Sequence, residues 1–489
     1  MNPCRKFALF PLAGAALTAV AVCIFAGTAP AQQPSQLTFQ KALLPNAPHV
    51  QLLAQAGQIT SPQMLIGAPP PMPPKPPTAA PAGPTLTLAQ AEQMAIQNNP
   101  HITVARLLAL AQAQITRQAR SAYMPMAYSD LEAVGSHYQS RLTAMGFLQS
   151  SRLLDKAAGG LTVDQLITDF GRTHNLLLSA RSTAQAQLEN ERATEQDITL
   201  TVDQAFYRGL TAQADMRVAE ETVAQRQATA DQIGALTKAK LRSDVDLSFA
   251  DVQLSQARLL LLNAQNQAQD AMAALNTVLG SEQDQQYTLV DQTPANPQPP
   301  PQDPEPLVQQ AFGARPDLAA LNDNFTAAAE YSKAERDLWM PTVSAMAVVG
   351  ATPVRDDLIQ SSWYGGAGAS INIPLFNGFL FNAEAREARL RAGAAQQQVR
   401  NLRDDIARDV RTATLDAQDA FDRIAVTQEM LNESNLALDL SQARYKIGLS
   451  GIVELTQAQL AQTQAQIEYT NARYAYQTAQ AVLRYQLGQ

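Results

Sequence analysis

The stretch RYKIGLSGIVEL, residues 444–455, places Gly448 and Gly451 inside sequence that otherwise has the pattern of one very long helix. Glycine adopts positive φ without steric cost, so the two glycines predict a sharp reversal between two helices, where positive φ is needed. A related stretch, TKAKLRSDVDL at residues 237–247, contains no glycine. It predicts the same reversal from polar and charged residues, so we expect two helical hairpins in the chain.

The two hairpins belong to halves of the chain that resemble each other. YMP at residues 123–125 matches WMP at residues 339–341, at an offset of 216 residues. Farther on, VDL at residues 245–247 matches VEL at residues 453–455, at an offset of 208. Two constant offsets, with one length change between them, indicate a tandem duplication of a unit of about 200 residues.

Each half predicts the same order of elements: a helix, two strands, a long helix, a tight turn and a last helix. Hydrophobic periodicity and X-Pro steps set the bounds. In the first repeat, residues 85–290, the expected elements are a helix at 87–122, strands at about 126–137 and 161–170, and helices at 173–235 and 246–278, the last two forming the hairpin 173–278. In the second repeat, residues 305–489, they are a helix at 305–338, strands at 342–354 and 363–373, and helices at 380–445 and 452–486 within the hairpin 380–487. A proline-rich connector, 291–304, separates the repeats.

The long helices carry small or apolar residues at alternating steps of four and three. This heptad spacing of small residues favours close, coiled-coil packing. The residues concerned are Ile198, Val202, Ala205, Gly209, Ala212, Met216, Ala219 and Val223 in the first half, and Val410, Ala413, Ala417, Ala420 and Ile424 in the second. A 60-residue helix is about 90 Å long and a 35-residue helix about 52 Å. Two short helices stacked end to end match one long helix, which predicts a tall wall of antiparallel helices.

The N-terminus has the pattern of an export signal. Arg5 and Lys6 precede an apolar, alanine-rich stretch, and APA at residues 29–31 is a typical cleavage pattern. Cleavage after Ala31 removes Cys4 and Cys23, so the exported chain has no thiol, and its formal net charge changes from −8 to −10. Lipidation at Cys23 is disfavoured because Val22 precedes it. Residues 32–84, which end in a proline-rich run, predict a disordered or extended leader.

The remaining composition excludes several classes of function. No run of about 20 apolar residues follows the signal, so no transmembrane helix is expected. No basic footprint for nucleic acid is present. The four histidines are scattered without metal-ligand spacing, and no nucleophile motif or phosphate-binding loop appears. We therefore expect no enzyme activity, cofactor or metal.

The strands indicate a membrane. In WYGGAGASINI, residues 363–373, alternate residues are apolar from Trp363 to Ile373, and the residues between them are small or polar. Strands of about ten residues with this alternation are typical of outer-membrane barrels, although a soluble hairpin with one buried face has the same pattern. Four strands cannot close a barrel, and an open edge in lipid leaves backbone groups unsatisfied. Three chains would supply twelve strands.

From about residue 85 to 489 the chain resembles the TolC family of outer-membrane efflux channels. The resemblance is carried by LTLAQAEQMAIQNNPHI near residues 85–102, the YMP and WMP steps, INIPLFNG at 371–378 and ARYKIGLSGIVELTQAQ at 443–459. It implies a mainly α-helical fold with a membrane β-barrel contribution, in which a homotrimer forms a twelve-stranded β-barrel that continues into a long α-helical barrel. It also implies an outer-membrane location with the helices in the periplasm, and docking to a periplasmic adaptor coupled to an inner-membrane pump.

The hairpin turns are then the candidate gate at the periplasmic mouth. Asp246 and Glu454 match two acidic sites of the family, and Tyr445 matches a tyrosine that helps to hold the entrance closed. Gln457 stands where the family has a second acidic residue, and Ser450 where it has an arginine. Six carboxylates in a trimer would favour cations. The alternative is that Asp246 and Glu454 only stabilise helix N-termini through the helix dipole.

The same turns are the candidate adaptor-docking site, formed by Lys238, Lys240, Arg242, Lys446, Gly448, Leu449 and Gly451. The function expected is the passive exit duct of a tripartite efflux pump. A duct for type I protein secretion would have the same sequence features, and a secreted trimeric coiled-coil stalk or adhesin is the alternative from another class.

Overall fold

The computed structural model describes residues 83–134, 141–142, 151–152, 156–281, 285–294, 296–354 and 361–489, all within one compact unit, Pro77–Gln489. The predicted signal peptide, Cys23 and the predicted leader up to residue 82 lie outside the described residues.

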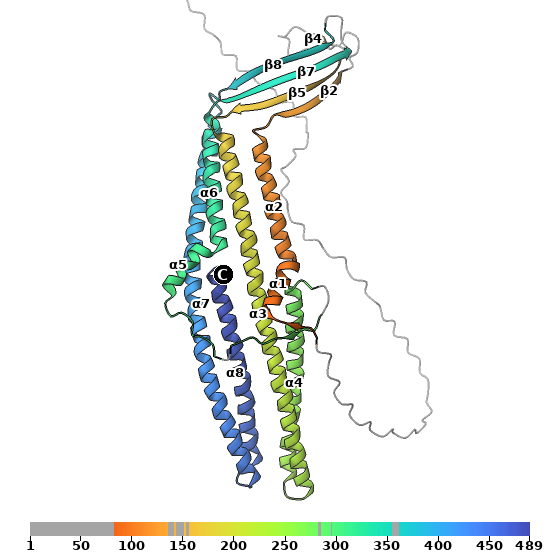
Figure 1. Ribbon diagram of the computed structural model, residues 1–489, viewed down its shortest axis with the longest axis vertical. Coiled ribbons are helices and arrows are strands. Elements are labelled where there is room, and N and C mark those ends of the chain that lie inside the picture. Colours follow the sequence, from red (N-terminus) through yellow and green to blue (C-terminus); the bar gives the residue numbers. More distant parts are fainter. Residues whose placement is uncertain are drawn as a thin grey trace, which may run out of the picture. The chain divides into compact units, whose positions relative to one another are not determined.

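Helices dominate the described chain, and their order repeats (Figure 1). The first half contains α1 (Leu88–Asn98), α2 (Pro100–Ser121), α3 (Arg172–Lys238) and α4 (Asp244–Val278), and the second contains α5 (Pro304–Ala314), α6 (Pro316–Arg336), α7 (Leu380–Lys446) and α8 (Ile452–Gln486). Helices α3 and α7 have 67 residues each, and α4 and α8 have 35 each. Equal lengths at equivalent positions are what a duplicated unit produces.

The first helix of each half is broken, where the sequence predicted one continuous helix at 87–122 and another at 305–338. Asn99 has ψ 124° and Arg315 has ψ 121°, so both are extended. Each precedes a proline, whose ring disfavours the helical conformation of the residue before it, and the proline then starts the next helix. A short 3₁₀ helix, Asp337–Trp339, follows α6.

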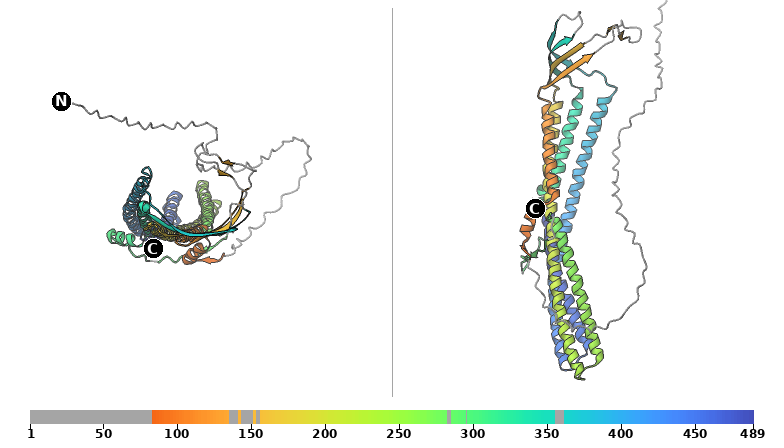
Figure 2. Two further views of the ribbon diagram at one scale, coloured as in Figure 1. Left: turned by 90° about the horizontal axis from the view of Figure 1, so that it is seen from above. Right: turned by 90° about the vertical axis from the view of Figure 1, so that its right-hand side faces the viewer.

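The short helices stack end to end along the long ones, as their lengths predicted. Both α2 and α4 pack on α3, and both α6 and α8 pack on α3 and α7. The Asn99 side chain donates a hydrogen bond to the Val278 carbonyl at 2.9 Å, which joins the start of α2 to the end of α4. Arg315 makes the equivalent link between α6 and α8 through Gln486. Seen from above, the helices and the sheet follow one arc, with α4 and α7 on opposite arms (Figure 2).

The small-residue seams lie inside this wall. Val202, Gly209, Ala219, Val410 and Ala417 are buried. None of the described helices is both long enough and apolar enough to cross a bilayer.

Four strands form an antiparallel sheet at one end of the helices, in the order β2-β5-β7-β8. They are β2 (Met126–Val134), β5 (Lys156–Thr168), β7 (Thr342–Val354) and β8 (Trp363–Asn372). The start of β5 lies five residues before the predicted 161, because the run AAGG at 157–160 has no apolar–polar alternation. The last residues predicted for the first strand, 135–137, lie outside the described chain. Two short pairs were not predicted: β1 (Thr85–Leu86) with β6 (Thr288–Leu289), and β3 (Arg141–Leu142) with β4 (Ser151–Arg152).

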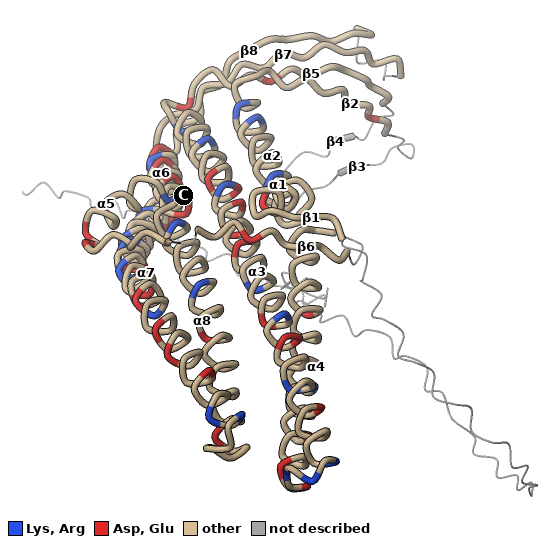
Figure 3. The backbone as a smooth tube through the Cα atoms, turned by 60° about the horizontal axis from the view of Figure 1, so that its bottom comes forward, with Lys and Arg blue, Asp and Glu red and all other residues tan. Residues whose placement is uncertain are grey.

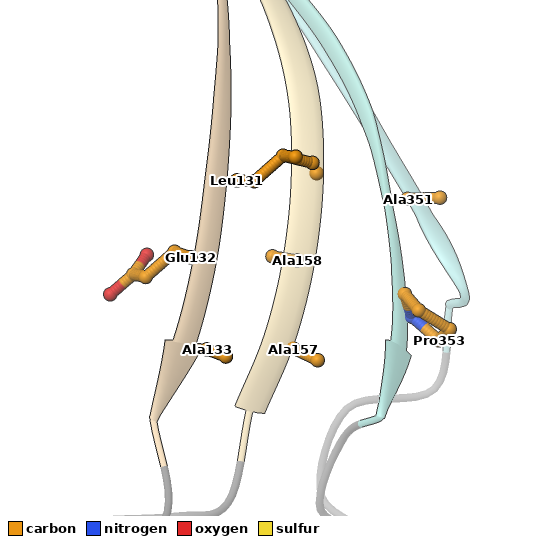
Figure 4. Close-up of a pocket in the computed structure, with 8 residues that line it drawn as sticks. Leu131, Glu132, Ala133, Ala157, Ala158, Ala351 and Pro353 are labelled. Carbon is orange, nitrogen blue, oxygen red and sulfur yellow. The ribbon is translucent and has the colours of Figure 1, made fainter.

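The sheet has two chemically different faces. On one face Tyr128 donates to Asp164 at 2.7 Å, and the hydroxyls of Ser344 and Ser370 lie 2.9 Å apart. The opposite face carries Leu131, Ala133, Ala157, Gly159, Ala351 and Pro353 around a shallow apolar hollow of about 440 Å³. Figure 4 shows Leu131 and Ala133 pointing away from the side to which Glu132 points. The sheet therefore has one polar face and one apolar face.

Candidate gate at the hairpin tips

Both long helices end in the same kind of turn. In the first hairpin, Lys240 adopts φ 60° and the Leu241 amide donates to the Leu236 carbonyl at 2.9 Å. In the second, Gly448 adopts φ 76° and the Leu449 amide donates to the Arg444 carbonyl at 2.9 Å. These are Schellman caps, in which one left-handed residue lets the chain leave the helix. Lysine replaces glycine in the first turn, as a sequence without glycine requires.

The two glycines of the opening stretch have different roles. Gly448 has the positive φ that the sequence predicted. For Gly451 that prediction is wrong, because its φ is −85° and its ψ 168°, an extended conformation just before α8. Ser243 occupies the equivalent place before α4, and its hydroxyl accepts a hydrogen bond from the Val245 amide at 3.2 Å. Gly451 is therefore an N-cap position without a capping side chain.

The two hairpins of one chain share a core at their tips. All four helices contribute buried side chains: Ala230 and Ile233 from α3, Ala250 and Leu254 from α4, Leu438 and Tyr445 from α7, and Ile452 and Leu455 from α8. Direct contacts join α8 to α3 and to α4. The tips therefore pack as a small four-helix unit.

Arg242 links the first hairpin to Tyr445 of the second. Its guanidinium carbon lies 4.3 Å from the centre of the Tyr445 ring, and its Nη2 donates to the Tyr445 carbonyl at 3.1 Å. Tyr445 is only 4% exposed, and burial raises the pKa of its hydroxyl. That hydroxyl has no hydrogen-bond partner in the described part of the chain. Arg242 therefore contacts both the backbone carbonyl and the ring of Tyr445.

A second arginine lies deeper in the same contact. Arg226 of α3 is 4% exposed and donates to the Gln459 side chain of α8. The Gln459 amide in turn donates to the Thr229 hydroxyl at 3.4 Å. Burial lowers the pKa of Arg226 to about 10, because a charged guanidinium is poorly solvated there. Its partners are neutral, so this layer joins the hairpins through polar contacts without an ion pair.

The predicted gate carboxylates lie in the first turns of α4 and α8. Figure 3 shows acidic and basic positions at the tips of both hairpins. Glu454 pairs with Arg444 at 3.2 Å, and both side chains are exposed. Asp246 is half-buried near Tyr445. The negative charge of Asp246 helps to raise the pKa of the Tyr445 hydroxyl. Gln457 is exposed, and the Ser450 hydroxyl is buried without a partner among the described residues.

The predicted docking residues are mostly on the surface. Lys238, Lys240, Lys446, Gly448 and Gly451 are exposed. Leu449 and its repeat equivalent Leu241 are each 69% exposed. Arg242 differs from this group, because its side chain turns inward onto Tyr445.

The inward position of Arg242 was missed, although the sequence contained a signal for it. The 208-residue offset aligns Arg242 with Ser450, the position at which the TolC family resemblance places an arginine. The arginine is therefore present on the other copy of the repeat. The buried position of Arg226 was also missed. The signal for it is that Arg226, a long charged side chain, lies between Thr222 and Ala230 in the seam of small residues.

Comparison with known proteins identifies the family. The profile of the family named Outer membrane efflux protein matches residues 91–281 and again residues 307–489. The chain belongs to this family. The two matched segments each contain one helical hairpin and one pair of long strands, so the family pattern occurs twice in one chain.

Individual members of the outer membrane efflux protein family are distant in sequence and close in fold. The outer membrane efflux protein BepC of Brucella suis biovar 1 (strain 1330) is 25% identical over 390 residues, which cover 76% of this chain and 79% of that protein. The outer-membrane channel OprN superimposes with a TM-score of 0.72 at 19% identity, covering 82% of this chain and 89% of that chain. The Campylobacter jejuni CmeC channel gives 0.71 at 15% identity, covering 82% and 85%.

These similarities establish the general function. The family and its structural neighbours are channels, not enzymes. The chain is an outer-membrane efflux protein, and its long helices are the periplasmic part of an exit duct.

Proposed function

We propose that three copies of this chain close one channel through the outer membrane and the periplasm. The sheet supports this proposal because β2 and β8 are its two edges, and its faces differ in polarity. An edge strand in lipid needs a partner for its backbone groups. Three four-stranded sheets joined edge to edge give twelve strands, an even number that suits such barrels.

The edges of the helical wall support the same assembly. Large apolar side chains are exposed on α2 and α4 at one edge and on α7 at the other. They are Val104, Leu107, Leu108 and Leu110 on α2; Val245, Phe249, Val252, Leu259 and Leu262 on α4; and Leu415, Val426, Leu436 and Leu440 on α7. Exposed apolar surface of this extent marks an interaction site. Joining α7 of one copy to α2 and α4 of the next would bury both edges.

In this assembly six hairpin tips surround the periplasmic mouth. Asp246 and Glu454 supply six carboxylates, which attract cations and repel one another. The exposed lysines and leucines of the tips suit an adaptor protein that connects the duct to an inner-membrane pump. The duct itself conducts passively, and the pump selects the substrate.

The observation that carries the proposal is the two-faced, open-edged sheet on top of a curved helical wall with apolar edges. The test is single-channel recording of detergent-purified protein in a planar bilayer. We expect discrete, long-lived, cation-preferring openings. The double variant Asp246→Asn, Glu454→Gln should lose cation preference. The control Asp231→Asn neutralises an exposed carboxylate on α3, before the turn, and should keep the preference.

A well-folded trimer that conducts neither as wild type nor with both carboxylates neutralised would contradict the duct. Openings with unchanged cation preference in the double variant would contradict only the gate role of the two carboxylates.

A further inference from the structure

The polar face of the sheet carries a tyrosine that lies along the sheet surface. Tyr364 of β8 pairs with Gly350 of β7, which in turn pairs with Gly160 of β5. A Cβ added at either glycine would overlap the Tyr364 hydroxyl. Glycine within a strand leaves room for another group to approach the backbone closely. The side chain of Tyr364 therefore runs across the sheet from β8 toward β2, with its phenol end above the two glycines.

A carboxylate lies at the end of this row of the sheet. Gly160 pairs with Asp130 of β2, and neighbouring strands are about 4.8 Å apart. The Tyr364 hydroxyl, above Gly160, is therefore only one strand away from the Asp130 position. Asp130 is exposed, and Tyr364 is 38% exposed. Both side chains can be reached from solvent on the polar face.

A second tyrosine and a second carboxylate lie in the neighbouring rows. Tyr128 is two residues from Asp130 along β2, which corresponds to about 7 Å, and it is 46% exposed. Its hydroxyl donates to the Asp164 carboxylate of β5 at 2.7 Å. We name Tyr128, Asp130, Asp164 and Tyr364 together the aromatic–acidic patch. Two aromatic rings and two carboxylates thus share one small area of the polar face.

The carboxylates of the aromatic–acidic patch have no cationic partner among the described residues. Neither Asp130 nor Asp164 forms an ion pair there. Lys156 is the only lysine or arginine in the four long strands. It pairs with Val134, four residues beyond Asp130 and about 14 Å along the strand. The patch therefore has negative charge beside exposed aromatic surface.

This combination of groups fits a particular class of ligand. Aromatic rings attract cations through the ring quadrupole, and a nearby carboxylate adds Coulomb attraction. An organic cation can place its apolar or aromatic body against the tyrosines and its charge near the carboxylates. A hydrated metal ion has no apolar body, and an organic anion is repelled by the carboxylates.

We propose that the aromatic–acidic patch binds organic cations on their way out through the barrel. This rests on the trimeric duct proposed above and names a class of substrate for it. In the trimer, three patches face one lumen, so a leaving cation meets three equivalent sites near the outer end of the duct.

Fluorescence anisotropy of ethidium, a planar aromatic cation, tests the proposal in a titration with the purified protein in detergent. We expect saturable binding of ethidium and no binding of the anion carboxyfluorescein. Tyr364→Leu and Asp130→Asn should each weaken ethidium binding about threefold to fivefold. Tyr364→Phe keeps the ring and should bind within about twofold of wild type. Gel filtration checks that each variant has the wild-type oligomeric state.

Trp363→Leu is the matched control for the aromatic substitution. Trp363 is the neighbour of Tyr364 on β8 and is 67% exposed, but it pairs with Ala351 on the apolar face of the sheet. Removing this ring changes the lipid-facing surface and not the polar one. Ethidium should therefore bind Trp363→Leu as it binds wild type.

Three results would overturn the proposal. They are an absence of saturable ethidium binding by wild type, equal binding of carboxyfluorescein, and unchanged ethidium binding by both Tyr364→Leu and Asp130→Asn. Single-channel recording of the same samples keeps this failure apart from failure of the duct. Normal openings with any of the three results would contradict only the patch. Ethidium binding that depends on the patch, in a protein that never conducts, would support the patch and count against the duct.

Discussion

The properties of single residues in this protein depend on the side chains that the fold places beside them. Asp203 is an example, because this carboxyl lies on α3 beside the small-residue seam and is only 4% exposed. The Glu92 carboxyl of α1 lies beside it, and Arg484 of α8 approaches its Oδ2 at 3.2 Å. Burial, followed by the nearby Glu92, raises the pKa of Asp203 to about 7, and Arg484 opposes the shift.

This raised pKa predicts how stability depends on pH. The unfolded chain loses the Asp203 proton near its ordinary pKa of about 3.9, whereas the folded chain keeps it until about 7, so this residue lowers stability as pH rises through that interval. Asparagine does not ionise. We therefore expect the Tm of Asp203→Asn, relative to wild type, to be at least about 2 °C higher at pH 8 than at pH 5.

Circular dichroism at both pH values measures this difference. Asp231→Asn is the control, because Asp231 is an exposed carboxylate on the same helix. An Asp203→Asn variant whose relative Tm is the same at pH 5 and pH 8 would show that the carboxyl ionises in the folded protein as it does in water.

At the scale of elements, local backbone rules decide where helices begin and end. Pro100 and Pro316 break the first helix of each half, and Gly448 and Lys240 end the long helices by adopting positive φ. The sequence predicted the hairpins because a turn of this kind depends on neighbouring residues only. It did not predict the X-Pro breaks, because apolar periodicity continues across them.

The two glycines of the second turn should respond differently to one substitution. A Cβ added at Gly448 or at Gly451 meets no atom within 4 Å, so only backbone conformation distinguishes them. Gly448→Ser places a side chain at positive φ and should cost about 1 kcal/mol. Gly451→Ser supplies a capping hydroxyl, as Ser243 does before α4, and should gain a few tenths of a kcal/mol.

Hydrogen exchange of the amides at residues 444–452 measures this effect locally. One kcal/mol corresponds to about fivefold faster exchange for Gly448→Ser, while Gly451→Ser should exchange at the wild-type rate or more slowly. Equal acceleration in both variants would mean that the turn does not have the Schellman geometry.

At the scale of the whole molecule, the two faces of the sheet require different surroundings. Neighbouring residues of β7 illustrate this. Met346 pairs across the sheet with Asp164, on the face that carries Tyr128 and the serine pair, and Ala347 lies on the opposite face with Val163. In the proposed barrel, one of these faces meets a polar lumen and the other meets lipid.

The same substitution at these two positions should therefore give opposite results. Ala347→Lys should cost about 2–4 kcal/mol near the middle of the bilayer, whereas Met346→Lys places its cation beside Asp164 and should be tolerated. The amount of folded protein recovered in the outer-membrane fraction is the measurement. Comparable recovery of both variants would contradict a lipid-facing surface at Ala347.

The sequence by itself determined the long helices, the hairpin turns and the duplication, because each depends on residues close together in the chain or on a constant offset. It also predicted β7, β8 and the small-residue seams, whose periodicity is regular. Only the tertiary structure decided that β5 extends over 157–160, where small residues carry no alternation. Likewise, Arg242 meets Tyr445 across 203 residues of sequence, and Arg226 meets Gln459 across 233. Such contacts depend on how two separate hairpins pack against each other, and no local sequence pattern specifies which residues then meet.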